Sequence, residues 1–220
     1  MLRDISLKDI SDGNKYTKND LVRLGCNNCN GCSFCCEDMS DTIMVDPLDV
    51  YRLCKHFNRS FESFIDNELE LRVVDGLILP GIKMNESNNS CSFLIDGRCS
   101  IHSIRPSFCR LFPLGRIYED NGFSYFLQKD QCLVKNRSKV RISTWIGEDN
   151  MIAYEDFCNR WHSVIVYMRE RAAVASSTEE LQAISMELLS RFFTKGYVAK
   201  DDNMFYKEFA IRVRSLNISS

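Results

Sequence analysis

Five of the 11 cysteines in this chain of 220 residues lie in one short stretch, CNNCNGCSFCC at residues 26–36. Two ligand spacings overlap there: C-x2-C-x2-C-x3-C, which starts at Cys26, and C-x2-C-x2-C-C, which starts at Cys29. The first is the spacing of bacterial iron–sulfur proteins, and in either pattern thiolates three positions apart can converge on one ion or cluster. The ligands predicted from this stretch are Cys29, Cys32, Cys35 and Cys36.

The adjacent pair Cys35-Cys36 limits how these thiolates can be shared. Neighbouring side chains on an extended backbone point to opposite sides, so one tetrahedral ion can hardly accept both without strain. We therefore expect the pair to be divided, either between two sites or into one ligand and one spectator.

A second group of cysteines follows in the middle of the chain. Cys91 and Cys99 flank a predicted hairpin with an Asp96-Gly97 turn, which brings their thiols together. Pro106 and Pro113 restrict the backbone on either side of the next cysteine. Sulfur-only ligation favours zinc or an iron–sulfur cluster over magnesium, calcium or manganese, and the spacing leaves both open. The predicted ligands of this group are Cys91, Cys99, Cys109 and Cys132.

The composition excludes several classes of protein. The net charge of −2 gives no basic surplus for nucleic acid or anionic membranes. No apolar run approaches the roughly 20 residues that span a bilayer. Residues 1–18 contain no apolar segment of a secretory signal, and the odd number of cysteines does not suit a disulfide framework. We expect a cytoplasmic protein with reduced, metal-binding thiols, which interacts with neither nucleic acid nor membrane.

Local patterns predict short elements first and long helices last. We expect a strand at 42–45, a helix that starts at Asp46-Pro47, a short helix over 60–69 and hairpins over 71–79 and 117–127. Basic residues alternate over 135–141, as on the exposed face of a strand. Helical spacing returns over 154–168, in a helix that starts at the capping box Ser177-x-x-Glu180 and runs to 193, and over 201–216.

These elements predict a single α+β domain. It comprises a loosely structured lead-in at 1–25 with at most a short helix, a cysteine-cluster metal-binding region with short β-hairpins at 26–147, and helices at 148–220 that pack on the same domain. Metal binding should be part of folding, because the cysteine loops need a cation to neutralise their thiolates.

The motif CNGCSFCC at 29–36, followed by CSFLIDGRCSIHSIRPSFCRLFP at 91–113, resembles the YkgJ-type cysteine-cluster family of zinc- or iron-chelating domains. The later Cys132 and Thr144-Trp145-Ile146 also resemble that family, over roughly residues 26–165. The resemblance implies a cysteine-bound metal. Relatives with this motif include flagellin lysine N-methylases, which implies a protein- or peptide-modifying enzyme as an alternative.

Other candidate residues have more than one interpretation. Arg105 and Arg110 belong to the family motif and either bind a cofactor or anionic substrate or form ordinary salt bridges; Arg116 has the same two interpretations. Cys54 and Cys158 lie on apolar helix faces and are predicted to be inert thiols.

Among the histidines, only His102 lies near a predicted ligand. The predicted function is therefore a metal-binding protein with a zinc ion or iron–sulfur cluster whose reaction the sequence does not define. The alternatives are a structural zinc module that binds a protein and the modifying enzyme with a protein or peptide substrate.

Overall fold

The computed structural model describes residues 7–26, 32–37, 39, 42–120, 122–132, 134, 136–216 and 218, without the side chains of residues 7 and 8. It has the predicted α+β architecture, with hairpins in the first two-thirds and helices in the last third. Within the described residues the strands form two-stranded antiparallel sheets. The strands are β1 (Leu21–Gly25), β2 (Leu69–Val74), β3 (Leu77–Ile82), β4 (Leu94–Ile95), β5 (Arg98–Cys99), β6 (Leu114–Glu119), β7 (Gly122–Leu127) and β8 (Ser138–Arg141).

The helices range from single turns to a helix of 23 residues. The α-helices are α1 (Leu7–Ile10), α2 (Pro47–Phe57), α3 (Ser107–Leu111), α4 (Ile142–Ile146), α5 (Met151–Ala173), α6 (Thr178–Leu189) and α7 (Asp202–Arg214). The short turns are the 3-10 helices η2 (Phe34–Cys36), η3 (Phe61–Phe64) and η4 (His102–Ile104), and η5 (Ser190–Thr194), a π-helical turn.

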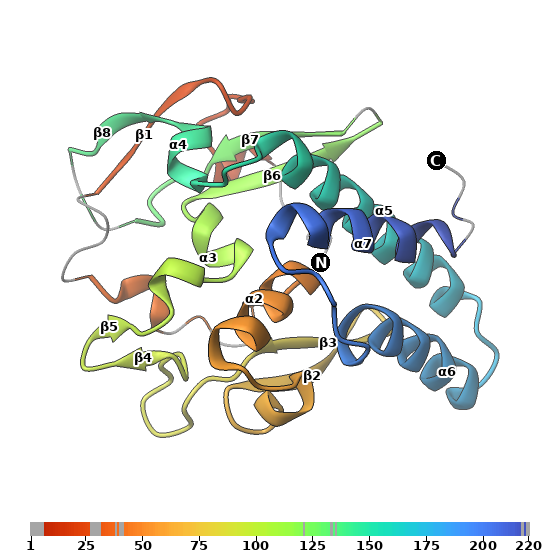
Figure 1. Cartoon of the computed structure of the whole chain (residues 1–220). Helices are drawn as coiled ribbons and strands as arrows, with labels where there is room; N and C mark the ends of the chain where they lie inside the picture. Colours follow the sequence, from red (N-terminus) through yellow and green to blue (C-terminus); the bar gives the residue numbers. More distant parts are fainter. Residues whose placement is uncertain are drawn as a thin grey trace.

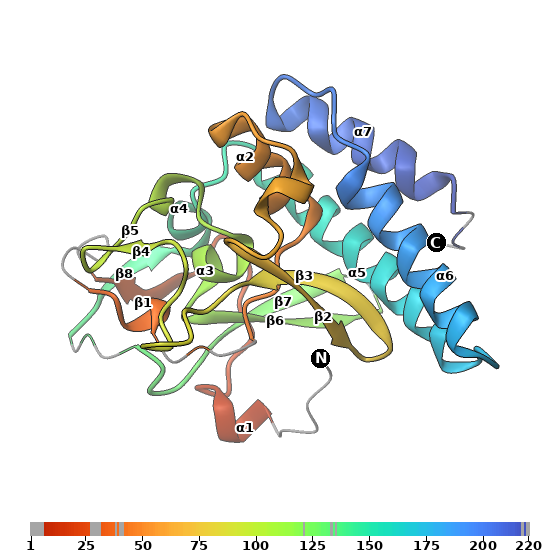
Figure 2. The same cartoon turned by 90° about the horizontal axis from the view of Figure 1, so that it is seen from below.

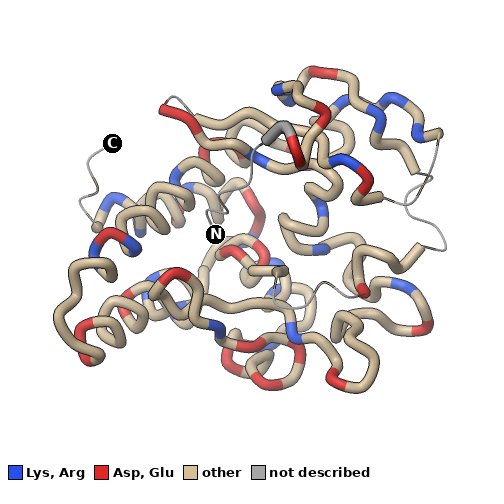
Figure 3. Tube along the Cα trace, turned by 180° about the vertical axis from the view of Figure 1, so that it is seen from behind, with Lys and Arg blue, Asp and Glu red and all other residues tan. Residues whose placement is uncertain are grey.

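The molecule has two unlike ends. Figures 1 and 2 show α5, α6 and α7 together at one end, while the β4–β5 hairpin and the β1–β8 ribbon lie at the other. The helix α2 and the β2–β3 hairpin lie between them. Figure 3 shows that acidic and basic residues are interspersed along the trace. None of the helices in the described residues is both long and apolar enough to cross a bilayer.

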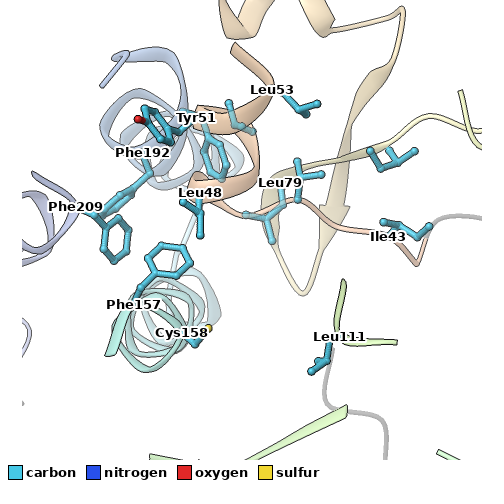
Figure 4. Packing of buried hydrophobic residues seen from close by; sticks show 14 of the residues in the cluster. Ile43, Leu48, Tyr51, Leu53, Leu79, Leu111, Phe157, Cys158, Phe192 and Phe209 are labelled. Atoms are coloured by element: carbon cyan, nitrogen blue, oxygen red, sulfur yellow. The ribbon is translucent and has the colours of Figure 1, made fainter. Parts of the chain in front are cut away.

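Packing of aromatic rings holds the helical end together (Figure 4). Phe157 of α5 lies against Phe209 of α7, with ring centroids 4.7 Å apart, and Phe192 of η5 lies 5.5 Å from the same Phe209 ring. Tyr51 of α2 stacks on Phe205 of α7 at 4.9 Å. All these rings are buried, so they contribute the large apolar area that stabilises a core.

Local signals in the sequence correctly located several element ends. Asp46 caps α2 in a capping box with Asp49, and Pro47 takes the first helical position. The Asp75-Gly76 and Asp96-Gly97 turns have positive φ at both residues, as tight hairpin turns require. Ser177 likewise accepts a hydrogen bond from the Glu180 amide at the start of α6.

Three expectations about secondary structure were wrong. Residues 42–45 form no strand, only one isolated bridge between Met44 and Gly81. The helix expected over 60–69 is only the single turn η3, because Leu69 already pairs with Ile82 in the β2–β3 hairpin. The lead-in is not merely loose, since it ends in β1, which pairs with β8 more than 100 residues later.

Candidate metal centre

Six cysteines from the two predicted groups line one cavity, which we call the cysteine cavity. They are Cys32, Cys35, Cys36, Cys91, Cys99 and Cys109. The space has a volume of about 50 Å³ and no carboxylate among its lining residues. The remaining lining residues are mostly apolar or basic: Ile43, Ile82, Phe93, Arg98, Ile101, His102, Arg105, Pro106, Phe112 and Trp145. The chain thus brings two cysteine stretches that are about 60 residues apart in the sequence to one place.

The adjacent cysteines lie on the 3-10 turn η2, not on an extended backbone. Cys35 and Cys36 both line the cavity, and their side chains are hydrogen-bonded to each other. The premise for dividing the pair between opposite sides was therefore wrong, because a helical turn does not alternate side chains as a strand does. The turn closes through the Cys36 amide, which donates to the Ser33 carbonyl at 2.7 Å.

A backbone hydrogen bond joins the two cysteine groups directly. The Cys91 amide donates to the Cys36 carbonyl at 2.7 Å, next to a bridge between Glu37 and Ser90. The β4–β5 hairpin then returns the chain, and Cys99 pairs with Leu94. This arrangement confirms the hairpin predicted between Cys91 and Cys99.

The helix α3 positions Cys109. Its first residue, Ser107, donates from its amide and its hydroxyl to the Asp49 carboxylate of α2, at 2.8 and 2.9 Å. Asp49 is only 1% exposed, so these bonds lie in a place that water does not reach. This carboxylate also accepts from the Asp46 amide in the capping box, and it therefore links the start of α2 to the helix that carries Cys109.

Sulfur–sulfur contacts divide the thiols into two kinds. The Cys36 thiol is hydrogen-bonded to Cys35 and Cys99, and these bonds, with the nearby Arg105 guanidinium, lower the pKa of both neighbours to about 7. The same bonds raise the pKa of Cys36. Burial raises the pKa of Cys91 to about 11 and that of Cys109 well above its ordinary value. Without a cation, the cavity therefore favours few negative charges.

The thiols share a cavity without being gathered around one point. In the described part of the chain, no three His, Cys, Asp or Glu side chains are grouped closely enough to hold a metal ion. The six cysteines that line the cavity are free thiols. The chemistry of the lining fits zinc or an iron–sulfur cluster, since both take thiolate sulfur, whereas hard cations need oxygen ligands.

Basic side chains form one wall of the cavity. Arg98 lies on β5, His102 on η4 and Arg105 directly after η4. Arg105 Nη1 lies 2.6 Å from His102 Nε2, and burial together with the charges of Arg105 and Arg98 lowers the pKa of His102. The aromatic side chain of Trp145, on α4, also lines the cavity. Its indole nitrogen donates to the Phe112 carbonyl at 3.2 Å.

Two predicted site residues lie outside this arrangement. Cys132 is a half-buried residue of the segment between β7 and β8 and does not line the cavity. Arg110 does not line it either. Its guanidinium lies 3.5 Å from Glu148 and donates to the Ile146 and Ser103 carbonyls, so its contacts are structural.

Other candidates fall outside the cavity or outside the described residues. Cys29 belongs to the residues that the structure does not describe. Cys54 is half-buried on α2 and Cys158 is buried on α5, away from the cavity lining, as expected of inert thiols. Arg116 donates to the Tyr154 hydroxyl at 2.6 Å and does not reach the cysteines.

Sequence reasoning missed three residues at the site. Arg98 lines the cavity and is exposed. In the sequence it stands between the Asp96-Gly97 turn and Cys99, and only its positive charge could have indicated a role at the site. Trp145, which the sequence relates only to the family resemblance, also lines the cavity. Asp49 lies in the helix predicted to start at Asp46-Pro47, but its bonds to Ser107 depend on packing that no local pattern shows.

Comparison with known proteins identifies one family. Residues 28–158, more than half of the chain, match the model of the CxxCxxCC family, described as a "putative zinc- or iron-chelating domain". No curated protein and no solved structure gives a significant match. With its two cysteine groups lining one cavity inside the matched range, this chain belongs to the CxxCxxCC family of zinc- or iron-chelating domains.

Proposed function

We propose that the cysteine cavity is a thiolate metal centre that holds a zinc ion or an iron–sulfur cluster. The observation that carries the proposal is the lining itself: six thiols and no carboxylate around one small space. A zinc ion or a cubane cluster needs four protein ligands, so the cavity offers more sulfur than one such site requires. The described cysteines are enough to complete a site, and Cys29 is a further proposed ligand.

A bound cation would neutralise the negative charge of deprotonated thiols in the cavity. The raised pKa values of Cys36, Cys91 and Cys109 reflect burial and neighbouring thiols. A metal deprotonates its thiol ligands outright, so binding would release protons and replace repulsion by attraction. The Arg105 guanidinium, which already acts on two of the thiols, would offset the remaining negative charge of the centre.

Binding would also require the thiols to converge. The turn η2 and the β4–β5 hairpin are short elements, and the Cys91–Cys36 backbone bond already aligns them. Rotation of side chains on these turns is a small change compared with folding a new element. The metal would therefore complete a site that the backbone has nearly assembled.

The test is anaerobic purification followed by elemental analysis and absorption spectroscopy. We expect a stoichiometric metal: iron with sulfide and thiolate-to-iron absorption for a cluster, or zinc in a colourless protein. A colourless zinc protein with four cysteine ligands would favour a structural module, whereas a redox-active iron centre would favour chemistry. Folded protein that holds neither metal after anaerobic purification would refute the proposal.

A further inference from the structure

The basic wall of the cysteine cavity has no acidic partner. Arg98, His102 and Arg105 line the cavity together, and none of the lining residues is acidic. Among the residues that the structure describes, neither Arg98 nor Arg105 forms a salt bridge to a carboxylate. By contrast, Arg52 and Arg110, which lie deeper in the fold, both pair with Glu148. Two arginines that line one cavity without a carboxylate give it a positive potential that attracts anions.

The two arginines have different surroundings. Arg105 is half-buried, and its Nη1 lies 2.6 Å from Nε2 of His102 in the cavity lining. Arg98 is exposed on β5, where it reaches the cavity from the outside. Arg105 is therefore held inside the cavity lining, whereas Arg98 is exposed and forms no salt bridge with a carboxylate in the described residues.

We propose that Arg98 binds the carboxylate or phosphate group of a small molecule at the opening of the cysteine cavity. This deepens the proposed function by naming a substrate class for the same site, and it rests on that function in treating the cavity as a working site. A guanidinium presents paired donors that match the oxygens of either group. The cavity of about 50 Å³ is the proposed place of the metal, so the anion binds at its opening, beside Arg98.

The apolar lining strengthens this interaction. Phe93, Phe112 and Trp145 line the same cavity and exclude water from one side of the bound group. A charge pair in such surroundings is screened less than one at an open surface. An aromatic body on the ligand would also find apolar contacts near the opening, which guides the choice of probes.

The test is calorimetric titration of the metal-loaded protein, as purified, with phenyl phosphate, benzoate and uncharged benzyl alcohol. We expect saturable binding of at least one anion and none of the alcohol. Binding of phenyl phosphate alone identifies a phosphate ligand, and binding of benzoate alone identifies a carboxylate ligand. Arg98→Gln should weaken anion binding about tenfold, the usual effect of losing a charged hydrogen-bond donor.

Arg214→Gln is the matched control, because this exposed arginine ends α7 and does not line the cavity. It should bind the anions as the unchanged protein does, and both variants should keep their metal. Equal weakening in the two variants, equal binding of benzyl alcohol, or absence of saturable binding would overturn the proposal. Loss of metal from Arg98→Gln would also overturn it, because Arg98 would then serve the thiolates.

Metal analysis of the same samples separates the two proposals. If the purified, folded protein holds no metal but binds the anions through Arg98, the metal centre is refuted and the anion site stands. If the protein holds stoichiometric metal but binds no anion, the anion site is refuted and the metal centre stands.

Discussion

The helical end and the cysteine end of this molecule are built in opposite ways. At the helical end, long helices bury fully enclosed rings such as Phe157, Phe205 and Phe209 against one another. At the cysteine end, a hairpin with two residues in each strand and single helical turns surround a cavity lined by thiols. Apolar burial stabilises the first without help, whereas the second has little regular structure of its own. Phe93 and Ile101 pack into the same apolar core, and we expect the proposed metal to complete the cysteine end beyond this packing.

The difference should show most strongly when metal is removed. A chelator with a reductant should loosen residues 32–37 and 91–111 while α5 and α7 keep their structure, because the binding energy of a structural zinc, about 10–16 kcal/mol, contributes directly to folding. Hydrogen exchange before and after chelation measures this segment by segment. Equal loss of protection at both ends would contradict the idea that only the cysteine end depends on metal.

A core substitution should have the reverse effect. Phe157→Ala removes a buried ring that contacts Phe205 and Phe209, and it should lower the free energy of unfolding by about 3–5 kcal/mol. Denaturant titration gives this number. The metal content of the protein that remains folded should not change, and loss of metal in proportion to stability would show that the ends are not separate.

Substitution of a proposed ligand isolates the cysteine end. Cys99→Ala and Cys109→Ala should each weaken metal binding more than the roughly 10–100-fold seen when a residue behind a ligand is changed. Competition with a chelator of known affinity measures this. Cys54→Ala is the matched control, since that thiol lies outside the cavity, and it should leave the metal affinity unchanged. If Cys54→Ala strips the metal while Cys109→Ala does not, the proposed ligand set is wrong.

The smallest effect should come from Asp49, whose buried carboxylate links α2 to α3 and should make stability depend on pH. Burial and the neighbouring Asp46 raise the pKa of Asp49 to about 8, above the ordinary value of 3.8. A raised pKa means that the folded state holds the proton more tightly, so this contribution to stability is complete below pH 4 and is lost as the pH rises towards 8.

Asp49→Asn removes this titration. We expect the decline in unfolding free energy between pH 4 and 8 to become shallower than in the unchanged protein, by at least the roughly 1.4 kcal/mol that one pKa unit represents. Denaturant titrations across that range measure the slope. Asp156→Asn, at an exposed carboxylate of α5, should keep the original slope, and an unchanged slope in Asp49→Asn would refute the assignment.

How far the site could be predicted depends on the range of the interactions. The spacing of cysteines in 29–36 and the hairpin at Cys91–Cys99 follow from neighbouring residues, and residues of both predicted ligand groups line the cavity. The exclusion of Cys132 and Arg110 from the cavity could not be predicted, since it depends on how distant segments pack. The Cys35-Cys36 expectation failed because a pair of letters does not show whether its backbone is extended or turned.

The sequence by itself determined where helices and turns begin, through the Asp46 cap, the Ser177 cap and the Asp-Gly turns, and which residues could supply thiolates. Only the tertiary structure decided that β1 pairs with β8 and that Asp49 holds the helix of Cys109. It also separated Arg105, beside the thiolates, from Arg98 at the opening. Caps and turns form between residues a few positions apart, whereas these contacts form only when the whole chain has packed.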